Sequence, residues 1–532
     1  MTFSRRQLTG AILGFSLIVF AAGSLDARAQ EKAAGSATSG ACPSNAAAFT
    51  DPLSKPHWNG WGVDPTQHRF QPADMARLSA SDVARLKLKW AFGFPGATRA
   101  VAQPTVFGGR VFVGSQNGEV YSLDAKSGCT YWEFGAYRGV RSAVVIGPRG
   151  DGWAAYFGDQ GANVYAIDAL TGKALWTVKV DDHPAAVVTG SPTLVGTTLF
   201  VPVSSYEEAT GASPFYKCCS FRGSPVALDT AAGKVLWKSY AIAQEAKPTA
   251  VNAKGVQLLG PSGAAIWSAP TYDAASQRVY VTTGDNYSDP PSGTSDAILA
   301  FDARTGELAW TRQVTAGDAF TIACPAGVNC PKANGPDFDF GSSAILADLP
   351  NGKRILVAGQ KSGIVTAVDP DRMGEIVWQK RVGAGSALGG VDWGIAADQS
   401  NVYVAVSDRI VSAERRKPGL SALKLDTGEE VWRTPNPLSS AQSAAVTAIP
   451  GLVFSGGHDG LLRAYSAAEG KIVWEMDTKG DYQTVNGVAA RGGSMDGGGA
   501  VVVDGMVYVG SGSLFFGGAP GNVLLAYSVD GM

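Results

Sequence analysis

Two clusters of oxygen-bearing side chains are candidates for binding a hard cation. Glu207-Glu208 follow a predicted strand, and Asp285-Asn286 form a second cluster further along the chain. Calcium is held in proteins by several oxygen ligands, usually a mixture of carboxylates and carbonyls. These residues are therefore candidates for holding a hard cation, with solvated loop acids as the alternative explanation of the same pattern. Which member of each pair would bind stays open.

The histidines argue against a zinc site. The four histidines are dispersed along the chain, as His57, His68, His183 and His458. A catalytic zinc ion needs clustered nitrogen, sulfur or carboxylate ligands. A zinc hydrolase is therefore excluded.

Six cysteines, an even number, predict disulfides if the protein is exported to an oxidising compartment. Two are adjacent, two lie six positions apart in one loop, and the last two would tie the N-terminal segment to the body. The candidate pairs are Cys218–Cys219, Cys324–Cys330 and Cys42–Cys129. The connectivity stays open, because spacing alone does not fix it.

The N-terminus has the features of an export signal. Arg5-Arg6 precede an apolar run over 11–22, and Ala27-Arg28-Ala29 form a small-x-small cleavage site. The run is short for a bilayer span. We expect residues 1–29 to be a signal peptide and the mature protein to be periplasmic, without a membrane anchor. The segment 4–8 (SRRQL) resembles a twin-arginine signal but does not decide between the Sec and Tat routes.

The overall charge excludes a polyanionic partner. The 44 basic side chains nearly cancel the 46 acidic ones, giving a net charge of −2. Nucleic-acid binding proteins usually carry an excess of basic residues, which this chain does not have. The 67 glycines and 45% hydrophobic residues are typical of many short strands joined by tight turns.

A sequence repeat indicates which elements must position these side chains. The phrase Ala-x-Asp-x-x-Thr-Gly-x-x-x-Trp recurs with substitutions, and its full copies end at Trp132, Trp176, Trp237, Trp310, Trp378, Trp432 and Trp474. An eighth copy begins at Ala526 and stops before its Trp, and the segment 86–90, ending in Trp90, would supply the missing strand. Each glycine permits a tight hairpin, and each Trp can pack on the neighbouring unit.

Such units cannot bury both faces alone, so they must stack in a closed ring. The sequence predicts an all-β, eight-bladed β-propeller over residues 86–532, with residues 30–85 packing on it as an N-terminal segment. Insertions at 204–223, 284–296 and 315–341 lengthen the loops between repeats. Long loops on such a ring usually carry the functional site.

This repeat resembles the tryptophan-docking repeat of the quinoprotein alcohol dehydrogenases, from Trp58 to the C-terminus. The segments 57–62 (HWNGWG) and 218–223 (CCSFRG) look closest to the polyvinyl-alcohol dehydrogenase branch. The resemblance implies an enzyme that oxidises an alcohol by hydride transfer to pyrroloquinoline quinone (PQQ), with calcium as a Lewis acid. It favours a secondary alcohol, with polymeric polyvinyl alcohol as a candidate.

The resemblance also implies catalytic residues. The segment 337–341 (DFDFG) matches the family's aromatic-Asp motif, which makes Asp339 the general base and a calcium ligand. Lys361 lies where the family has a basic residue against the quinone oxygens, so it would stabilise negative charge there. The implied metal ligands are Glu207 or Glu208, Asp285 or Asn286, and Asp339.

In the family, a ring formed by adjacent cysteines packs on one face of the quinone. Cys218-Cys219 come later in the chain than in methanol-dehydrogenase-like members, so a structural loop staple is the alternative. Trp267 precedes a strand instead of ending one, and the resemblance implies that it stacks on the opposite quinone face. The other implied cofactor contacts are Arg222, with Arg138 and Arg141 as alternatives, and Thr189, Ser204, Asp392, Trp393 and Asn486.

The expected electron acceptor is inferred from a motif that does not occur in the chain. No Cys-x-x-Cys-His sequence occurs in the chain, so we expect no fused cytochrome domain, and an external c-type cytochrome is implied. The alternative function is a non-catalytic periplasmic propeller scaffold that resembles an outer-membrane assembly factor. The combination of Cys218-Cys219, Trp267 and Asp339 argues against this alternative.

Overall fold

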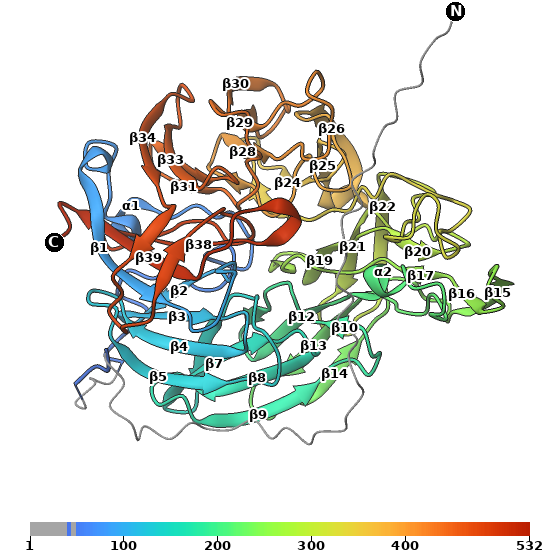
Figure 1. Cartoon of the computed structure of the whole chain (residues 1–532), viewed down its shortest axis with the longest axis horizontal. Coiled ribbons are helices and arrows are strands. Elements are labelled where there is room, and N and C mark those ends of the chain that lie inside the picture. Colours follow the sequence, from blue (N-terminus) through green and yellow to red (C-terminus); the bar gives the residue numbers. More distant parts are fainter. Residues whose placement is uncertain (1–39, 44–48) are drawn as a thin grey trace, which may run out of the picture.

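Short runs of β-branched and aromatic residues, separated by glycine turns, build a ring of antiparallel sheets (Figure 1). The computed structural model describes residues 40–43 and 49–532. Runs such as 279–281 and 402–404 form central strands of their sheets and are completely buried. Within the described residues the chain forms eight blades, which confirms the predicted all-β propeller.

The first four blades follow one another along the chain, and each runs from the centre of the ring to its outside. Blade 1 contains β2 (Thr105–Phe107), β3 (Arg110–Gly114), β4 (Glu119–Asp124) and β5 (Thr130–Gly135). Blade 2 contains β6 (Val145–Arg149), β7 (Gly152–Gly158), β8 (Asn163–Asp168) and β9 (Ala174–Lys179). Blade 3 contains β10 (Ala186–Val187), β11 (Thr193–Val195), β12 (Thr198–Ser205), β13 (Ser224–Asp229) and β14 (Val235–Lys238). Blade 4 contains β18 (Thr271–Asp273), β19 (Arg278–Thr282), β21 (Ala297–Asp302) and β22 (Leu308–Gln313).

The second half of the ring repeats the same order. Blade 5 contains β23 (Ile345–Asp348), β24 (Arg354–Gly359), β25 (Ile364–Asp369) and β26 (Glu375–Arg381). Blade 6 contains β27 (Ala396–Ala397), β28 (Asn401–Val406), β29 (Gly419–Lys424) and β30 (Glu430–Pro435). Blade 7 contains β31 (Thr447–Ile449), β32 (Leu452–Gly456), β33 (Leu461–Ser466) and β34 (Ile472–Asp477). Blade 8 contains β37 (Val501–Val503), β38 (Met506–Ser511), β39 (Val523–Val529) and, as its outer strand, β1 (Leu86–Gly93).

Blade 8 closes the ring by joining two distant parts of the chain. Strand β1 pairs antiparallel with β39, and Trp90 lies opposite Ala526 (Figure 1). This is the pairing that the incomplete eighth repeat predicts. It leaves β39 paired on both sides and makes β1 the outer strand of the blade.

The repeat tryptophans join neighbouring blades, as predicted. Trp132 ends blade 1, and its indole N–H donates a hydrogen bond to the carbonyl oxygen of Ala169 in blade 2, at 3.2 Å. The ring lies over Gly172, which has a φ of +77° and where an added Cβ would come within 2.8 Å of the indole. The turn therefore needs glycine for both its backbone conformation and the contact.

The described part of the N-terminal segment crosses the ring. A disulfide joins Cys42 to Cys129 of blade 1, and the predicted Cys218–Cys219 and Cys324–Cys330 pairs are also present. Arg69 is fully buried and donates hydrogen bonds to the carbonyl oxygens of Val446 and Trp61. The predicted signal peptide, residues 1–29, lies outside the described residues.

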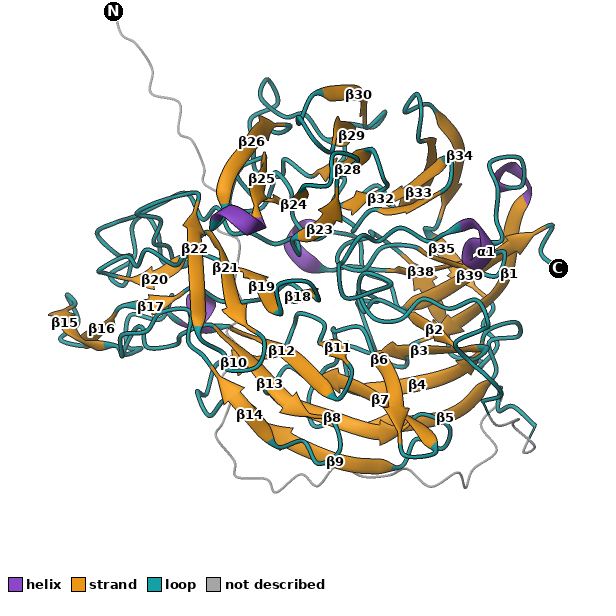
Figure 2. Cartoon of the chain, turned by 180° about the vertical axis from the view of Figure 1, so that it is seen from behind, coloured by secondary structure: helices purple, strands orange, loops and turns teal. Residues whose placement is uncertain are grey.

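A few elements lie outside the blades, and strands dominate the chain (Figure 2). The short helices are α1 (Ala73–Ala76) and α2 (Glu207–Thr210), and the small strand pairs are β15 (Lys247–Val251) with β16 (Gln257–Gly260), β17 (Ser262–Gly263) with β20 (Asn286–Ser288), and β35 (Gly480–Tyr482) with β36 (Ala490–Gly492). The β15–β16 hairpin projects from the side of the ring and was not predicted (Figure 1). Among the residues that the structure describes, no helix is long and apolar enough to span a membrane.

Candidate active site

The loops between and within the blades surround a cavity of about 420 Å³. Each of the three predicted insertions contributes to its wall, for example through Ser204, Tyr287 and Asp339. This volume lies in the range of small-molecule and cofactor sites. The predicted residues that line it are Arg141, Thr189, Ser204, Glu208, Trp267, Asp339, Lys361, Asp392 and Trp393.

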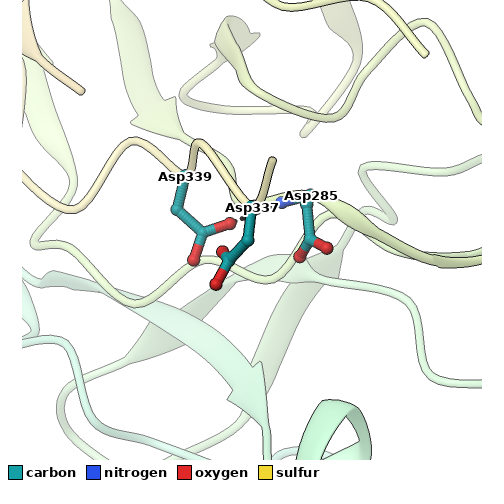
Figure 3. Close-up of side chains that lie close together, drawn as sticks. All are labelled: Asp285, Asp337 and Asp339. Atoms are coloured by element: carbon teal, nitrogen blue, oxygen red, sulfur yellow. Dashed lines mark hydrogen bonds between the residues drawn. The ribbon is translucent and has the colours of Figure 1, made fainter. Parts of the chain in front are cut away.

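Three buried aspartates converge at one side of this cavity (Figure 3). One carboxylate oxygen from each of Asp285, Asp337 and Asp339 lies within 4.8 Å of the other two. The backbone N–H of Asp285 donates to Asp339 Oδ1 at 2.7 Å. At Gly284 an added Cβ would come within 2.6 Å of the same oxygen, so the strand end can approach Asp339 only because a glycine precedes Asp285.

Lys361 neutralises part of this charge. It lies in the turn between β24 and β25, and its backbone N–H donates to the carbonyl oxygen of Asp339 at 2.9 Å. Its Nζ atom donates to Asp337 Oδ1 at 2.7 Å and to Asp339 Oδ2 at 2.9 Å. The turn therefore places one ammonium group between two carboxylates.

The electrostatics show an excess of buried negative charge. Burial raises the pKa of Asp285 and of Asp337 well above its usual range, and neighbouring carboxylates raise both further. Burial also raises the pKa of Glu208 to about 7, against the opposing charge of Lys361. The pKa of Lys361 is held well above its usual value, because the nearby carboxylates outweigh the effect of its burial.

This donor set fits a hard cation. Carboxylate oxygens are the preferred ligands of calcium, and a positive ion would relieve the repulsion that raises these pKa values. Asp285 Oδ2 is buried and has no hydrogen-bond partner among the described residues. An orphaned buried carboxylate oxygen is costly unless an ion or water satisfies it.

The structure separates the two glutamates of the first predicted cluster. Glu208 lines the cavity, whereas the carboxylate of Glu207 is completely buried and points away from it. Glu207 accepts hydrogen bonds from the backbone N–H groups of Ser220 and Phe221 and from the hydroxyl of Tyr216. Glu207 therefore fixes the loop that carries the adjacent cysteines, and the geometry favours Glu208 as the ligand.

The two residues of the second predicted cluster, Asp285 and Asn286, also differ in their surroundings. Asn286 Oδ1 accepts hydrogen bonds from the backbone and hydroxyl of Ser292. Its Nδ2 donates to the hydroxyl of Ser295 and to the carbonyl oxygen of Asp318. All of its polar atoms are thus used within the protein, which favours Asp285 over Asn286 as the ligand.

Aromatic and basic side chains form the rest of the cavity wall. The rings of Trp267 and Trp393 pack edge to face with their centroids 5.2 Å apart. The guanidinium of Arg141 lies 4.7 Å from the Trp393 ring, and Lys361 Nζ lies 5.8 Å from the Trp267 ring. Flat indoles beside cationic groups suit a planar anionic cofactor.

Four predicted cofactor contacts do not line the cavity. The Cys218–Cys219 disulfide is buried in the core of blades 2 and 3. Arg222 donates to the carbonyl oxygens of Ile242 and Ala243 and lies over the Tyr240 ring. Asn486 exchanges hydrogen bonds with the backbone N–H and carbonyl of Gly93. The disulfide therefore fits the loop-staple alternative, and Arg141 fits the cavity where Arg222 does not.

Two features of the site were not predicted from the sequence. Asp337 was quoted in the motif with Asp339 but was not assigned a role. Its carboxylate nevertheless joins the cluster, and its backbone has a φ of +59°. Arg409 lies at hydrogen-bond distance from His458, at 2.9 Å, and near Asp392 and Asp496, at 3.7 Å each. No sequence motif marks this network, because its members come from distant loops.

Two family models match the chain. The model described as "Glucose/ethanol/alcohol dehydrogenase, beta-propeller domain" matches residues 58–329. The model described as "Outer membrane protein assembly factor BamB" matches residues 361–523, a stretch that consists of propeller repeats.

Curated relatives and solved structures agree with the first model. A polyvinylalcohol dehydrogenase of Pseudomonas sp is 46% identical over 505 residues, covering 90% of this chain and 78% of the relative. A second one, of Sphingopyxis sp. (strain 113P3), is 41% identical over 506 residues, covering 89% and 76%. The structure of a quinohemoprotein alcohol dehydrogenase from Pseudomonas putida HK5 shares the fold, with a TM-score of 0.65 and 20% identity, over 90% of this chain and 81% of that one. The chain therefore belongs to the quinoprotein alcohol dehydrogenase family and is a PQQ-dependent alcohol dehydrogenase.

Proposed function

We propose that this enzyme oxidises secondary alcohols, including the hydroxyl groups of polyvinyl alcohol, and that it needs a calcium ion beside PQQ. The names of its 46% and 41% identical relatives support the substrate. The convergence of Asp285, Asp337 and Asp339 with Lys361 at one side of the cavity is the observation that carries the site assignment.

Calcium would be held by Asp285, Asp337, Asp339 and Glu208. All four carboxylates lie in or beside the cavity, and three have oxygens within 4.8 Å of one another. Trp267, Trp393, Arg141 and Arg409, which line the same cavity, would hold PQQ beside this cluster. When bound, PQQ supplies the electrophilic carbonyl that accepts the hydride, and calcium polarises it.

The protein's own groups would move and stabilise charge. Asp339 is the general base, because its carboxylate faces the cavity and accepts a hydrogen bond from Lys361. It takes the alcohol proton at Oδ2, the oxygen that already accepts from Lys361. The Lys361 ammonium stabilises negative charge that develops nearby, and Trp267 with Trp393 excludes water from one wall.

We further propose that the enzyme works in the periplasm and passes electrons to a separate c-type cytochrome. The basic pair, apolar run and cleavage motif within residues 1–29 support export. A relative that is 24% identical over 387 residues is named "Lupanine 17-hydroxylase [cytochrome c]", which supports a cytochrome c as the acceptor.

The test uses protein stripped of metal and cofactor, remixed with PQQ and calcium, and a dye acceptor with matched primary and secondary alcohols and polyvinyl alcohol. We expect turnover only when both PQQ and calcium are added, and a higher kcat/KM for each secondary alcohol than for its primary isomer. Turnover by the stripped protein without PQQ, or no turnover with it, would contradict the proposal.

The base assignment has its own test. Asp339→Asn should lower kcat by about 10²- to 10⁴-fold while PQQ still binds, because an amide cannot accept the proton. Asp426→Asn, which changes an exposed acid in a hairpin of blade 6, should behave as wild type. An unchanged kcat in Asp339→Asn would move the base to another residue.

A further inference from the structure

The outer end of the cavity is surrounded by apolar side chains that face solvent. Tyr206, Ile322, Ile410 and Phe516 line the cavity and are 43%, 55%, 68% and 61% exposed. They come from the loops of four different blades, numbers 3, 4, 6 and 8. We call these four residues the apolar rim. Large apolar side chains gathered at one exposed place usually mark a binding surface.

Two rim residues have a backbone conformation that is unfavourable for their type. Ile410 has a φ of +49° and Phe516 a φ of +47°. A β-branched residue is rarely found in the left-handed region, and the strain is kept only where the surroundings enforce it. A glycine or an asparagine at either position would adopt this conformation with less strain.

The surroundings do enforce this conformation. The carboxylate of Asp408 accepts hydrogen bonds from the backbone N–H groups of Ala384, Gly385 and Lys417. On its other side, the guanidinium of Arg409 lies 5.7 Å from the Phe516 ring. The residues before Ile410 are therefore anchored by Asp408, and Arg409 lies close to the Phe516 ring.

The chemistry changes from the inner to the outer end of the cavity. Asp339, Asp337 and Lys361 make the inner end charged, whereas the rim is apolar. A small alcohol that places its hydroxyl at Asp339 would lie inside the cavity and make little contact with the rim. A long chain with one hydroxyl at Asp339 must leave through the outer end and pass over the rim.

We propose that the apolar rim is a subsite that binds the methylene backbone of a polymeric polyol outside the catalytic cavity. This inference rests on the proposed function, because it assumes that hydroxyl groups are oxidised at Asp339. The subsite would select long substrates through apolar contact, which adds affinity without adding hydrogen bonds. Ile410 and Phe516 contribute most, since they are the most exposed members of the rim.

The test compares Ile410→Asn and Phe516→Asn with Met373→Asn in the holoenzyme, using a small dye acceptor. Asparagine tolerates the left-handed region, so these changes remove the apolar group without adding strain. Met373 is a matched control, because it is 66% exposed, has a φ of +55° and lies in a hairpin of blade 5 away from the cavity. The readout is kcat/KM for polyvinyl alcohol divided by kcat/KM for a small secondary alcohol.

We expect each rim variant to lower this ratio by roughly tenfold, the effect of losing one apolar contact, and the control to keep the wild-type ratio. Polymer binding to the holoenzyme, measured without electron acceptor, should weaken by the same factor. A ratio that stays at the wild-type value in both rim variants would overturn the inference. Loss of cytochrome c reduction with normal polymer kinetics would also overturn it and assign the rim to the redox partner. Failure of the wild-type enzyme to oxidise any alcohol would instead contradict the proposed function.

Discussion

Adjacent acidic residues have different roles in this site. Glu208 faces the cavity near Lys361, whereas Glu207 accepts hydrogen bonds from two backbone N–H groups and a tyrosine hydroxyl. The difference arises because α2 begins at Glu207, so successive side chains point about 100° apart around the helix axis.

Glutamine at each position should separate these roles. Glu208→Gln removes one negative ligand and should weaken calcium binding by roughly 10- to 100-fold, measured by calcium titration of the PQQ-loaded protein. Glu207→Gln should leave calcium affinity unchanged but lower the free energy of unfolding by about 2–3 kcal/mol, because charged hydrogen bonds are lost and the amide N–H₂ faces donors. Weaker calcium binding in Glu207→Gln alone would reverse the assignment.

At the level of residues, sequence could predict the chemistry but not the choice between neighbours. Asp339 and Lys361 were predicted from a motif and do lie together. The residue pair alone does not distinguish Asp285 from Asn286, since the choice depends on Ser292, further along the same loop, and on Asp318 in another loop. Arg222 was predicted for the cavity, but carbonyl groups of the following blade connection hold it outside.

The individual blades are linked by tryptophans whose hydrogen bonding differs. Trp132 donates its indole N–H to Ala169, whereas the indole N–H of Trp310 has no hydrogen-bond partner among the described residues. Both rings lie over a glycine of the next blade, at Gly172 and Gly374. The apolar contact is therefore shared by the two sites, and the hydrogen bond is not.

Replacement by phenylalanine should measure the hydrogen bond. Trp132→Phe should cost about 1–2 kcal/mol more unfolding free energy than Trp310→Phe, because it leaves a buried carbonyl oxygen without a donor. Denaturant unfolding of the two variants under identical conditions gives the difference. Equal costs would mean that apolar packing alone links the blades.

Sequence predicted these elements well where the repeat recurs and poorly where it does not. The blades were visible because each repeat places Trp, Asp and Gly at fixed positions. The β15–β16 hairpin has no such marker, and all residues of β15 are exposed, so no alternation of apolar and polar residues signals a strand. The insertions at 204–223, 284–296 and 315–341 could be located, but the directions of their side chains depend on contacts between loops.

The whole ring depends on closure between its ends. Strand β1 supplies the outer strand of blade 8, although more than 400 residues separate it from β39. Trp90 lies over Gly128 of blade 1, so the closing strand also joins blade 8 to blade 1. The incomplete eighth repeat allowed this closure to be predicted, because a half-finished sheet must be completed from elsewhere.

Loss of the contact made by Trp90 should destabilise strands β1 and β39 together. Trp90→Ala should cost about 3–5 kcal/mol and make the amides of β1 and β39 exchange with solvent together. Trp378→Ala removes the equivalent contact in the middle of the chain, where the ring lies over Gly428. In that variant the amides of β1 and β39 should stay protected from exchange. Hydrogen exchange followed by mass spectrometry distinguishes the two. Full protection of β39 in Trp90→Ala would mean that closure does not depend on this contact.

The same ring brings the loops of separate blades around one cavity, where a planar quinone and a divalent cation would be bound side by side. The most direct measurement is a PQQ titration of stripped protein, followed by quenching of indole fluorescence, with and without calcium and with Asp285→Asn. We predict one PQQ bound per chain, with affinity that rises when calcium is present and that no longer responds to calcium in the variant. PQQ binding that is the same with and without calcium, in both proteins, would contradict the account.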